Sequence, residues 1–177
     1  MRFLVALVAA FSIGHAYRTL PAALAPAIAS DLALEPWEIG LVGGAFNIVF
    51  AAMQLPVGVA LDRMALRHLV AALLAAAATG TAIGATATSL AALVLSQGLL
   101  GIGCSGLWLA VCVHVARTRP ASEFAWTTTV CAALGSSGMF LTTTPLALVV
   151  EGAGWRVAMA CIGALTLALL VLVLLAR

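Results

Sequence analysis

The chain has 177 residues, of which 64% are apolar and only 8% are charged, and its formal net charge is +2. A soluble domain carries about 25% charged residues, so this composition excludes a soluble globular protein. It predicts an integral membrane protein in contact with the lipid bilayer. The arginines are spread over the polar gaps rather than clustered, which gives no indication of a nucleic-acid partner.

Six apolar segments are each long enough to cross a bilayer, which requires about 20 residues. The gaps between them are short, so neighbouring helices should be antiparallel. Membrane strands do not fit, because the segments are rich in alanine and leucine and lack polar–apolar alternation. The expected fold is all-α, a polytopic membrane protein with six transmembrane helices in one domain, residues 1–177. The expected helices cover residues 3–28, 38–61, 69–88, 91–115, 127–150 and 155–176.

The distribution of arginine predicts the orientation. Under this arrangement six arginines outside the helices fall on one side of the membrane and Arg156 falls on the other. The positive-inside rule then places both termini in the cytoplasm of a multi-pass protein of the plasma membrane. The sequence has no lysine beside abundant alanine and arginine, which indicates a GC-rich bacterial source and therefore the inner membrane.

The first segment has a second interpretation. Arg2, the apolar run after it and the stretch ending at Ala16 are also typical of a secretory signal peptide. Apolarity continues to Ile28, however, and cleavage would leave five helices. We therefore expect a transmembrane helix here.

One charged turn stands between the second and third segments. It contains Asp62, Arg63 and Arg67, and each charge would cost about 2.5–3.5 kcal/mol inside the membrane, so the turn must lie in water. With Gly58, these residues resemble the loop signature Gly-x-x-x-Asp-Arg-x-Gly-Arg-Arg of the major facilitator superfamily, found between its second and third helices. The resemblance implies that Gly58, Asp62, Arg63 and Arg67 are gating residues. Because the dipole at a helix C-terminus disfavours an acid, Asp62 should also find an arginine partner.

The resemblance extends over the whole chain, as the N-terminal half of a family whose members usually have twelve helices. It implies a second six-helix half, either a C-terminal half or a second copy of this chain. Several positions depart from the family pattern. Ala65 and Leu66 differ from the signature, and Gln97 stands where many members carry an arginine associated with proton coupling. The coupling ion and the direction of transport are therefore not implied.

The charged turn also recurs once along the chain. A proline, an acid and an arginine return with the same spacing about half a chain later, three helices on, and therefore on the opposite side of the membrane. An inverted repeat of three helices plus three is how each half of such a transporter is built. We predict repeats over about residues 1–88 and 89–177. The matched residues are Pro56, Asp62 and Arg67, and then Pro145, Glu151 and Arg156.

Arg18 is the candidate for solute binding. It lies deep in the first segment, whereas all six acids lie in loops or at helix ends. An arginine within the membrane faces protein or a water-filled cavity and usually has a partner. Its planar fork suits the oxygens of an anion. Two alternatives remain open: a structural arginine bonded to backbone carbonyls, or a position nearer the membrane surface.

Four further polar residues are candidates for the same site. His15 shares a helical face with Arg18 and either contacts the solute or bonds a neighbouring helix. Asn47 and Gln54 are seven residues apart on one helix and therefore point the same way. In lipid, these side chains and Gln97 must face protein or water, so they line a cavity or bond between helices.

An enzyme is a weak alternative. Gly103-Cys-Ser105-Gly106 matches the Gly-x-Ser-Gly of rhomboid proteases, but no histidine follows His114 to serve as a base on a later helix. The four cysteines have no metal-ligand spacing, and no cofactor motif is present. We expect alternating-access transport of a small, anionic solute. The alternative is a truncated or non-transporting six-helix protein that acts as an assembly partner.

Overall fold

The computed structural model describes residues 2–176 and forms six membrane-length spans, as predicted. Two spans are interrupted: the fourth bends at Ser105–Gly106, and the fifth contains a 3-10 turn. The elements are α1 Arg2–Leu32, α2 Pro36–Arg63, α3 Leu66–Ala85, α4 Leu90–Cys104, α5 Leu107–Thr118, α6 Ala121–Ser136, η1 Ser137–Thr142, α7 Thr144–Ala153 and α8 Trp155–Leu175.

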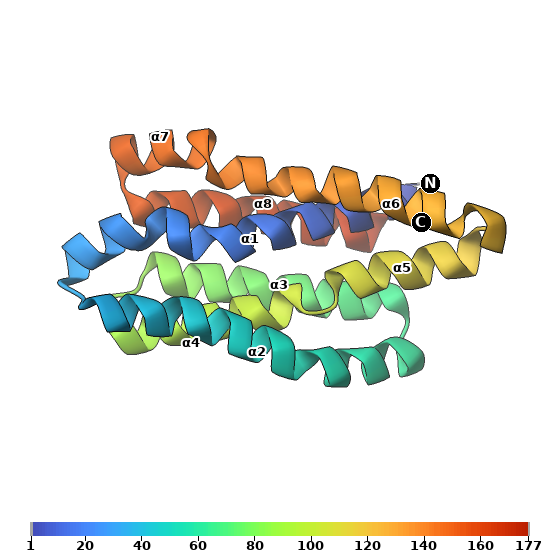
Figure 1. Ribbon diagram of the computed structural model, residues 1–177, viewed down its shortest axis with the longest axis horizontal. Helices are drawn as coiled ribbons and strands as arrows, with labels where there is room; N and C mark the ends of the chain where they lie inside the picture. Colours follow the sequence, from blue (N-terminus) through green and yellow to red (C-terminus); the bar gives the residue numbers. More distant parts are fainter. Residues whose placement is uncertain (1, 177) are drawn as a thin grey trace.

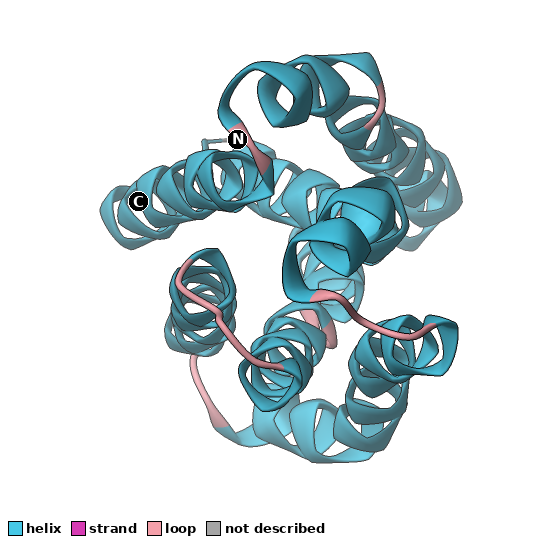
Figure 2. Ribbon diagram, turned by 90° about the vertical axis from the view of Figure 1, so that its left-hand side faces the viewer, coloured by secondary structure: helices cyan, strands magenta, loops and turns pink. Residues whose placement is uncertain are grey.

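The six spans run antiparallel to their neighbours in sequence. The chain ends, the α2–α3 turn and the α5–α6 turn lie at one end of the molecule, and the α1–α2, α3–α4 and α7–α8 turns lie at the opposite end (Figure 1). Viewed along its long axis, the chain is a bundle of helices standing side by side (Figure 2). This arrangement is the one expected from short polar gaps between six spans.

Local sequence signals explain where several helices begin. Glu35 and Glu38 form a capping box at the start of α2, where the Glu38 carboxylate accepts from the Glu35 backbone N–H at 2.8 Å. Ser89 caps α4 by accepting from the Ala92 N–H. Gly154 joins α7 to α8 with a φ of +87°, a left-handed conformation that glycine adopts without strain. The helix ends thus follow from the side chains beside them.

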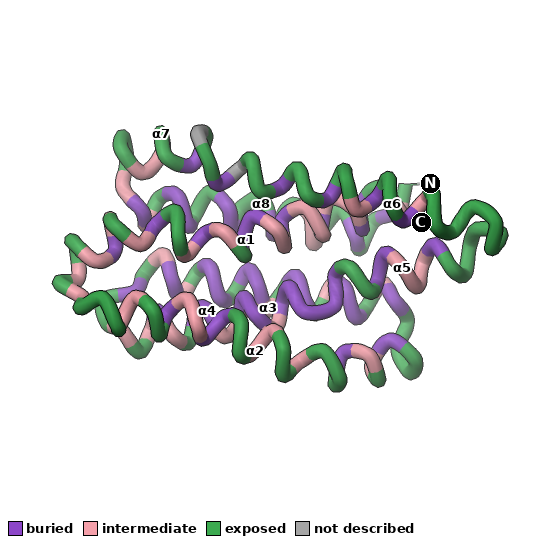
Figure 3. Tube along the Cα trace, viewed as in Figure 1, coloured by how far each residue is buried: buried purple, intermediate pink, exposed green. Residues whose placement is uncertain are grey.

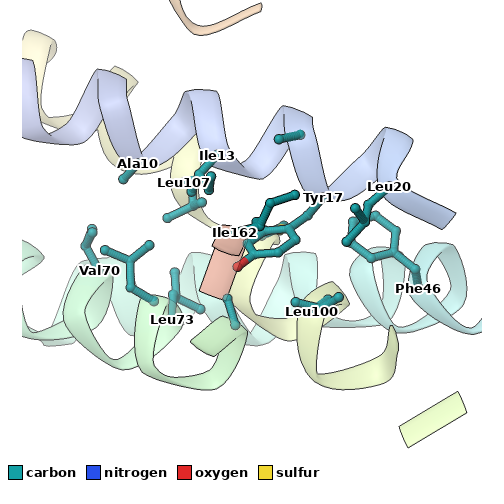
Figure 4. Close-up of a cluster of buried hydrophobic side chains, with 14 of the residues drawn as sticks. Ala10, Ile13, Tyr17, Leu20, Phe46, Val70, Leu73, Leu100, Leu107 and Ile162 are labelled. Carbon is teal, nitrogen blue, oxygen red and sulfur yellow. The ribbon is translucent and has the colours of Figure 1, made fainter. Parts of the chain in front are cut away.

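The core lies where α1 crosses α3, α4 and α8. Tyr17 of α1 points into a cluster with Leu73, Leu100 and Ile162 from those three helices (Figure 4). Its buried hydroxyl forms a hydrogen bond with the Thr166 hydroxyl of α8. Buried residues concentrate on α1, α3 and α4, whereas α2 and α6 are largely exposed (Figure 3). The core is therefore formed mainly by α1, α3 and α4, with α2 and α6 at its periphery.

Two arginines link the ends of α3 and α8, which pack against each other in antiparallel directions. Arg67, at the start of α3, donates to the carbonyl of Ala176, just after the end of α8. Arg156, at the start of α8, donates to the carbonyl of Ala87 at 3.0 Å and to Asp31 at 2.6 Å. Carbonyls at helix ends lack partners within the helix, so each arginine satisfies one of them. Such reciprocal contacts suit an inverted repeat, although the exact division of the repeats stays a prediction.

Replacing Arg67 with alanine should destabilise the bundle. The variant leaves the carbonyl of Ala176 without its charged donor, at a cost of about 1.5–3 kcal/mol. The exposed Arg63, four residues away in the same turn, makes no side-chain hydrogen bond within residues 2–176, so Arg63→Ala is the matched control. The thermal midpoint of each variant would be measured in detergent, with labelling of the buried Cys104 thiol as the signal that the protein has unfolded. Equal midpoints for the two variants would contradict the structural role of Arg67.

Candidate functional site

A cavity of about 310 Å³ lies between α1, α2 and the bend where α4 meets α5; we call it the Arg18 cavity. It brings together three of the predicted site residues, Arg18, His15 and Gln54. The bend at Ser105–Gly106 turns α5 so that its first residues reach the same space. The complete lining is Phe11, Gly14, His15, Arg18, Phe46, Phe50, Gln54, Cys104, Ser105, Trp108 and Leu109.

Arg18 lies at the middle of the membrane-spanning length. At 1.5 Å per residue it is about 24 Å from the Arg2 end of α1 and about 21 Å from the Leu32 end. Its side chain is exposed, and among residues 2–176 the structure records no ion pair or side-chain hydrogen bond for it. The guanidinium carbon stands 5.6 Å from the centre of the Phe50 ring. Arg18 thus lies midway along the first helix, and its hydrogen-bond donors remain available.

A second hollow of about 260 Å³ adjoins Arg18 and contains Asn47. Arg18 and Phe46 line both spaces. Asn47 is exposed, and its amide nitrogen donates to the carbonyl of Gly43 at 3.1 Å, which leaves the amide oxygen available. Asn47 therefore lies near Arg18 but not in the Arg18 cavity.

Aromatic rings form much of the cavity wall. Phe11 of α1 and Trp108 of α5 are in contact, with ring centres 4.9 Å apart and planes tilted by 36°. Phe46 and Phe50 of α2 are nearly parallel, with centres 6.0 Å apart. His15 meets the Phe11 ring edge-on at 4.6 Å. The cavity thus combines one cation with an apolar, aromatic surface.

Sequence reasoning missed these rings, although a signal was present. Phe11, His15 and Arg18 recur at spacings of four and three residues, which place them on one face of α1. Phe46, Phe50 and Gln54 recur at spacings of four on α2. Each set could have been recognised as an aromatic stripe leading to a polar residue. That Trp108 joins them depends on the α4–α5 bend.

Gln97 is not in the cavity. It is only 3% exposed and does not line either hollow. Its side-chain oxygen has no hydrogen-bond partner within residues 2–176. Gln97 was predicted to share a site with Arg18, but the structure does not place it in the Arg18 cavity. The reason is the rotation of α4, which turns this residue into the helix interface while Ser105, eight positions later, reaches the cavity.

The predicted gating residues lie at the end of the molecule that holds both termini. Gly58 is partly exposed, and a Cβ added there would meet nothing within 4 Å. Asp62 and Arg63 are exposed. The expected arginine partner of Asp62 is wrong for the described residues, which show no ion pair there. Arg67 turns to α8 instead.

Arg119, in the α5–α6 turn at the same end of the molecule, already has an ion-pair partner. Arg119 pairs with Glu123 four residues later, at 3.5 Å. Asp62 is thus left facing solvent at the end of α2.

Comparison with known proteins agrees with this architecture. Residues 4–177 match the Major Facilitator Superfamily. The chain is 33% identical over 169 residues to an MFS-type efflux pump of Mycolicibacterium smegmatis, covering 93% of this chain and 38% of the pump. It is 27% identical over 143 residues to a probable sulfoacetate transporter, SauU, of Cupriavidus necator, covering 81% of this chain and 33% of that protein.

The fold is similar to a solved transporter. The chain superimposes on the POT family transporter PepTSo with a TM-score of 0.82 at 19% identity, covering 99% of this chain and 37% of the transporter. The chain thus spans 33–38% of the length of these relatives. With a family match over nearly its whole length and a fold that agrees, this chain belongs to the major facilitator superfamily.

Proposed function

We propose that the chain is the N-terminal half of a secondary active transporter that moves a small anionic solute by alternating access. The observation that carries the proposal is Arg18, a guanidinium at mid-membrane depth that borders a cavity and has no counter-charge among the described residues. A permanent cation within the membrane usually pairs with another charged group or with backbone carbonyls. A solute carboxylate, sulfonate or similar group would supply the counter-charge and match the planar fork.

A second six-helix half would complete the site. Arg18, Asn47 and Gln54 are all exposed at membrane depth on the same side of the bundle. Hydrocarbon cannot solvate such groups, so protein or enclosed water must face them. Either further chain or a second copy of this chain would supply that surface. The chain's coverage of 38% of the efflux pump is in keeping with a partner half.

Gating is assigned to the turn around Asp62. We propose that Gly58, Asp62, Arg63 and Arg67 face the partner half when the cytoplasmic side closes, with both termini in the cytoplasm. The open space beside Gly58 and the free carboxylate of Asp62 support a contact made outside this half. Arg67 would contribute to gating indirectly, because its side chain already links the start of α3 to the end of α8.

The relatives support an anionic solute without specifying one. SauU is described as a probable sulfoacetate transporter, and sulfoacetate is an organic anion. The name of the efflux pump does not specify a substrate. The competing possibility is a non-transporting six-helix assembly partner, which the chain's coverage of its relatives also allows.

Uptake by reconstituted protein tests the proposal. The protein, expressed from its complete gene and placed in liposomes, should show saturable uptake of a labelled organic carboxylate. The neutral amide of the same acid should not compete, because it offers Arg18 no charge. Protein-free liposomes correct for leakage. Uptake no greater than in protein-free liposomes, for every carboxylate in a panel, would contradict transport and favour the assembly partner.

A further inference from the structure

The apolar part of the Arg18 cavity points to a narrower class of solute. We propose that the anion bound here is an aromatic monoanion, a single ring bearing one carboxylate-like group. Its ring would lie against Phe11, Phe50 and Trp108, and its charged group would meet Arg18. This inference rests on the proposed transport function and names the chemistry of its solute.

The first argument is the shape and chemistry of the wall. Phe11 and Trp108 form a continuous aromatic surface contributed by α1 and α5, with ring centres 4.9 Å apart. Phe46 and Phe50 add a second surface from α2. Aromatic rings pair preferentially in tilted or offset geometries, each worth about 0.5–1.5 kcal/mol beyond the burial of area. A flat ring gains such contacts, whereas a small hydrated anion would leave these surfaces in water.

The second argument is the position of the cation. The Arg18 guanidinium carbon lies 5.6 Å from the centre of the Phe50 ring, a distance at which cation and ring attract. This contact orients the guanidinium at the edge of the aromatic surface and leaves its N–H groups unpaired among residues 2–176. An arginine held next to rings suits a ligand whose charged and aromatic parts are adjacent.

The third argument is the amount of charge. Among the residues that line the cavity, Arg18 is the one permanent cation, and His15, Gln54 and Ser105 are the other polar side chains. The faces of the aromatic rings carry partial negative charge and disfavour a second anionic group. A monoanion therefore matches this half better than a dianion. The part of the site that this half contributes, about 310 Å³, already has room for one ring.

Binding of matched small molecules tests the inference. The protein expressed from its complete gene would be titrated with phenylacetate, acetate, benzyl alcohol and benzylamine, with ligand-induced thermal stabilisation as the measurement. Phenylacetate should bind about ten-fold more tightly than acetate, because its ring adds buried apolar area and ring contacts. Benzyl alcohol and benzylamine should bind far more weakly, since neither offers a negative charge to Arg18.

Two variants connect this preference to the aromatic wall. Trp108→Leu should remove most of the difference in affinity between phenylacetate and acetate. Trp126→Leu is the matched control, because Trp126 is 74% exposed on α6 and does not line the Arg18 cavity. If Trp108→Leu does not fold, Phe50→Leu makes the same test from α2.

The outcomes separate this inference from the proposed function. Equal affinity for acetate and phenylacetate would overturn the aromatic preference and leave anion transport standing. An unchanged preference in folded Trp108→Leu or Phe50→Leu would also overturn it. Binding of benzylamine as tight as that of phenylacetate, or no binding of any anion, would instead overturn the proposed function itself.

Discussion

Arg18→Gln should lower the uptake efficiency for an organic anion by about 30-fold or more. Removing one partner of a desolvated, hydrogen-bonded charge pair costs about 2–5 kcal/mol, and each 1.4 kcal/mol is a factor of ten. Glutamine retains polar atoms of comparable reach but no charge. Arg18→Lys should be intermediate, since lysine keeps the charge but loses the planar fork. Concentration-dependent uptake into proteoliposomes measures all three proteins.

Stability separates a binding role from a structural one for Arg18. The side chain makes no ion pair or hydrogen bond within residues 2–176, so Arg18→Gln should leave the thermal midpoint unchanged or raise it. Arg119→Gln is the control, because this arginine is exposed, pairs only with Glu123 and does not line the cavity. A midpoint that falls together with uptake would show that Arg18 supports the fold instead.

Alanine at Gly101 or Gly103 should destabilise the bundle by about 1–3 kcal/mol each, the usual cost of overpacking. A Cβ at Gly101 would lie 2.6 Å from the carbonyl oxygen of Phe46, in the backbone of α2. A Cβ at Gly103 would lie 2.7 Å from the carbonyl oxygen of Leu73, in the backbone of α3. Backbone cannot move aside as a flexible side chain does, so α4 would be pushed away from one neighbour or the other.

The same helix supplies a matched control. A Cβ at Gly98 would meet only Val49, at an ordinary contact distance of 3.7 Å, so Gly98→Ala should be nearly neutral. The thermal midpoints of the three variants would be compared, with labelling of the buried Cys104 thiol as the signal for unfolding. Gly101→Ala should also reduce uptake more than Gly103→Ala, because it shifts Phe46 and Phe50 at the cavity wall. If Gly98→Ala were as damaging as the other two, close approach of the backbones would not be the cause.

Most of the topology could be predicted from local features of the sequence. The length of an apolar run and the positions of charges decide whether a segment crosses a bilayer, and neither depends on which helices touch. The six spans, their antiparallel order and the position of Arg18 well inside the first helix were therefore predicted correctly. The interruptions were not, although small and polar residues accompany both: the bend lies at Ser105–Gly106, and the 3-10 turn Ser137–Thr142 lies between Gly135 and Pro145.

The partners of individual side chains depended on tertiary packing. Asp62 was expected to have an arginine partner, but Arg67, five residues away, contacts the carbonyl of Ala176 across the α3–α8 interface. Gln97 was grouped with Arg18 by its polarity, yet the rotation of α4 buries it away from the cavity. Sequence distance does not give the rotation of a helix about its axis when its faces are equally apolar.

The sequence by itself thus determined that the chain crosses the membrane six times and carries an arginine at mid-depth, because both follow from the cost of placing charge in hydrocarbon. Only the tertiary structure decided that Arg18 stands beside Phe50 and an aromatic cavity. That site combines residues from α1, α2 and α5, and their meeting depends on the close approach of α4 to its neighbours and on its bend. These are consequences of packing between helices, and no single segment encodes them.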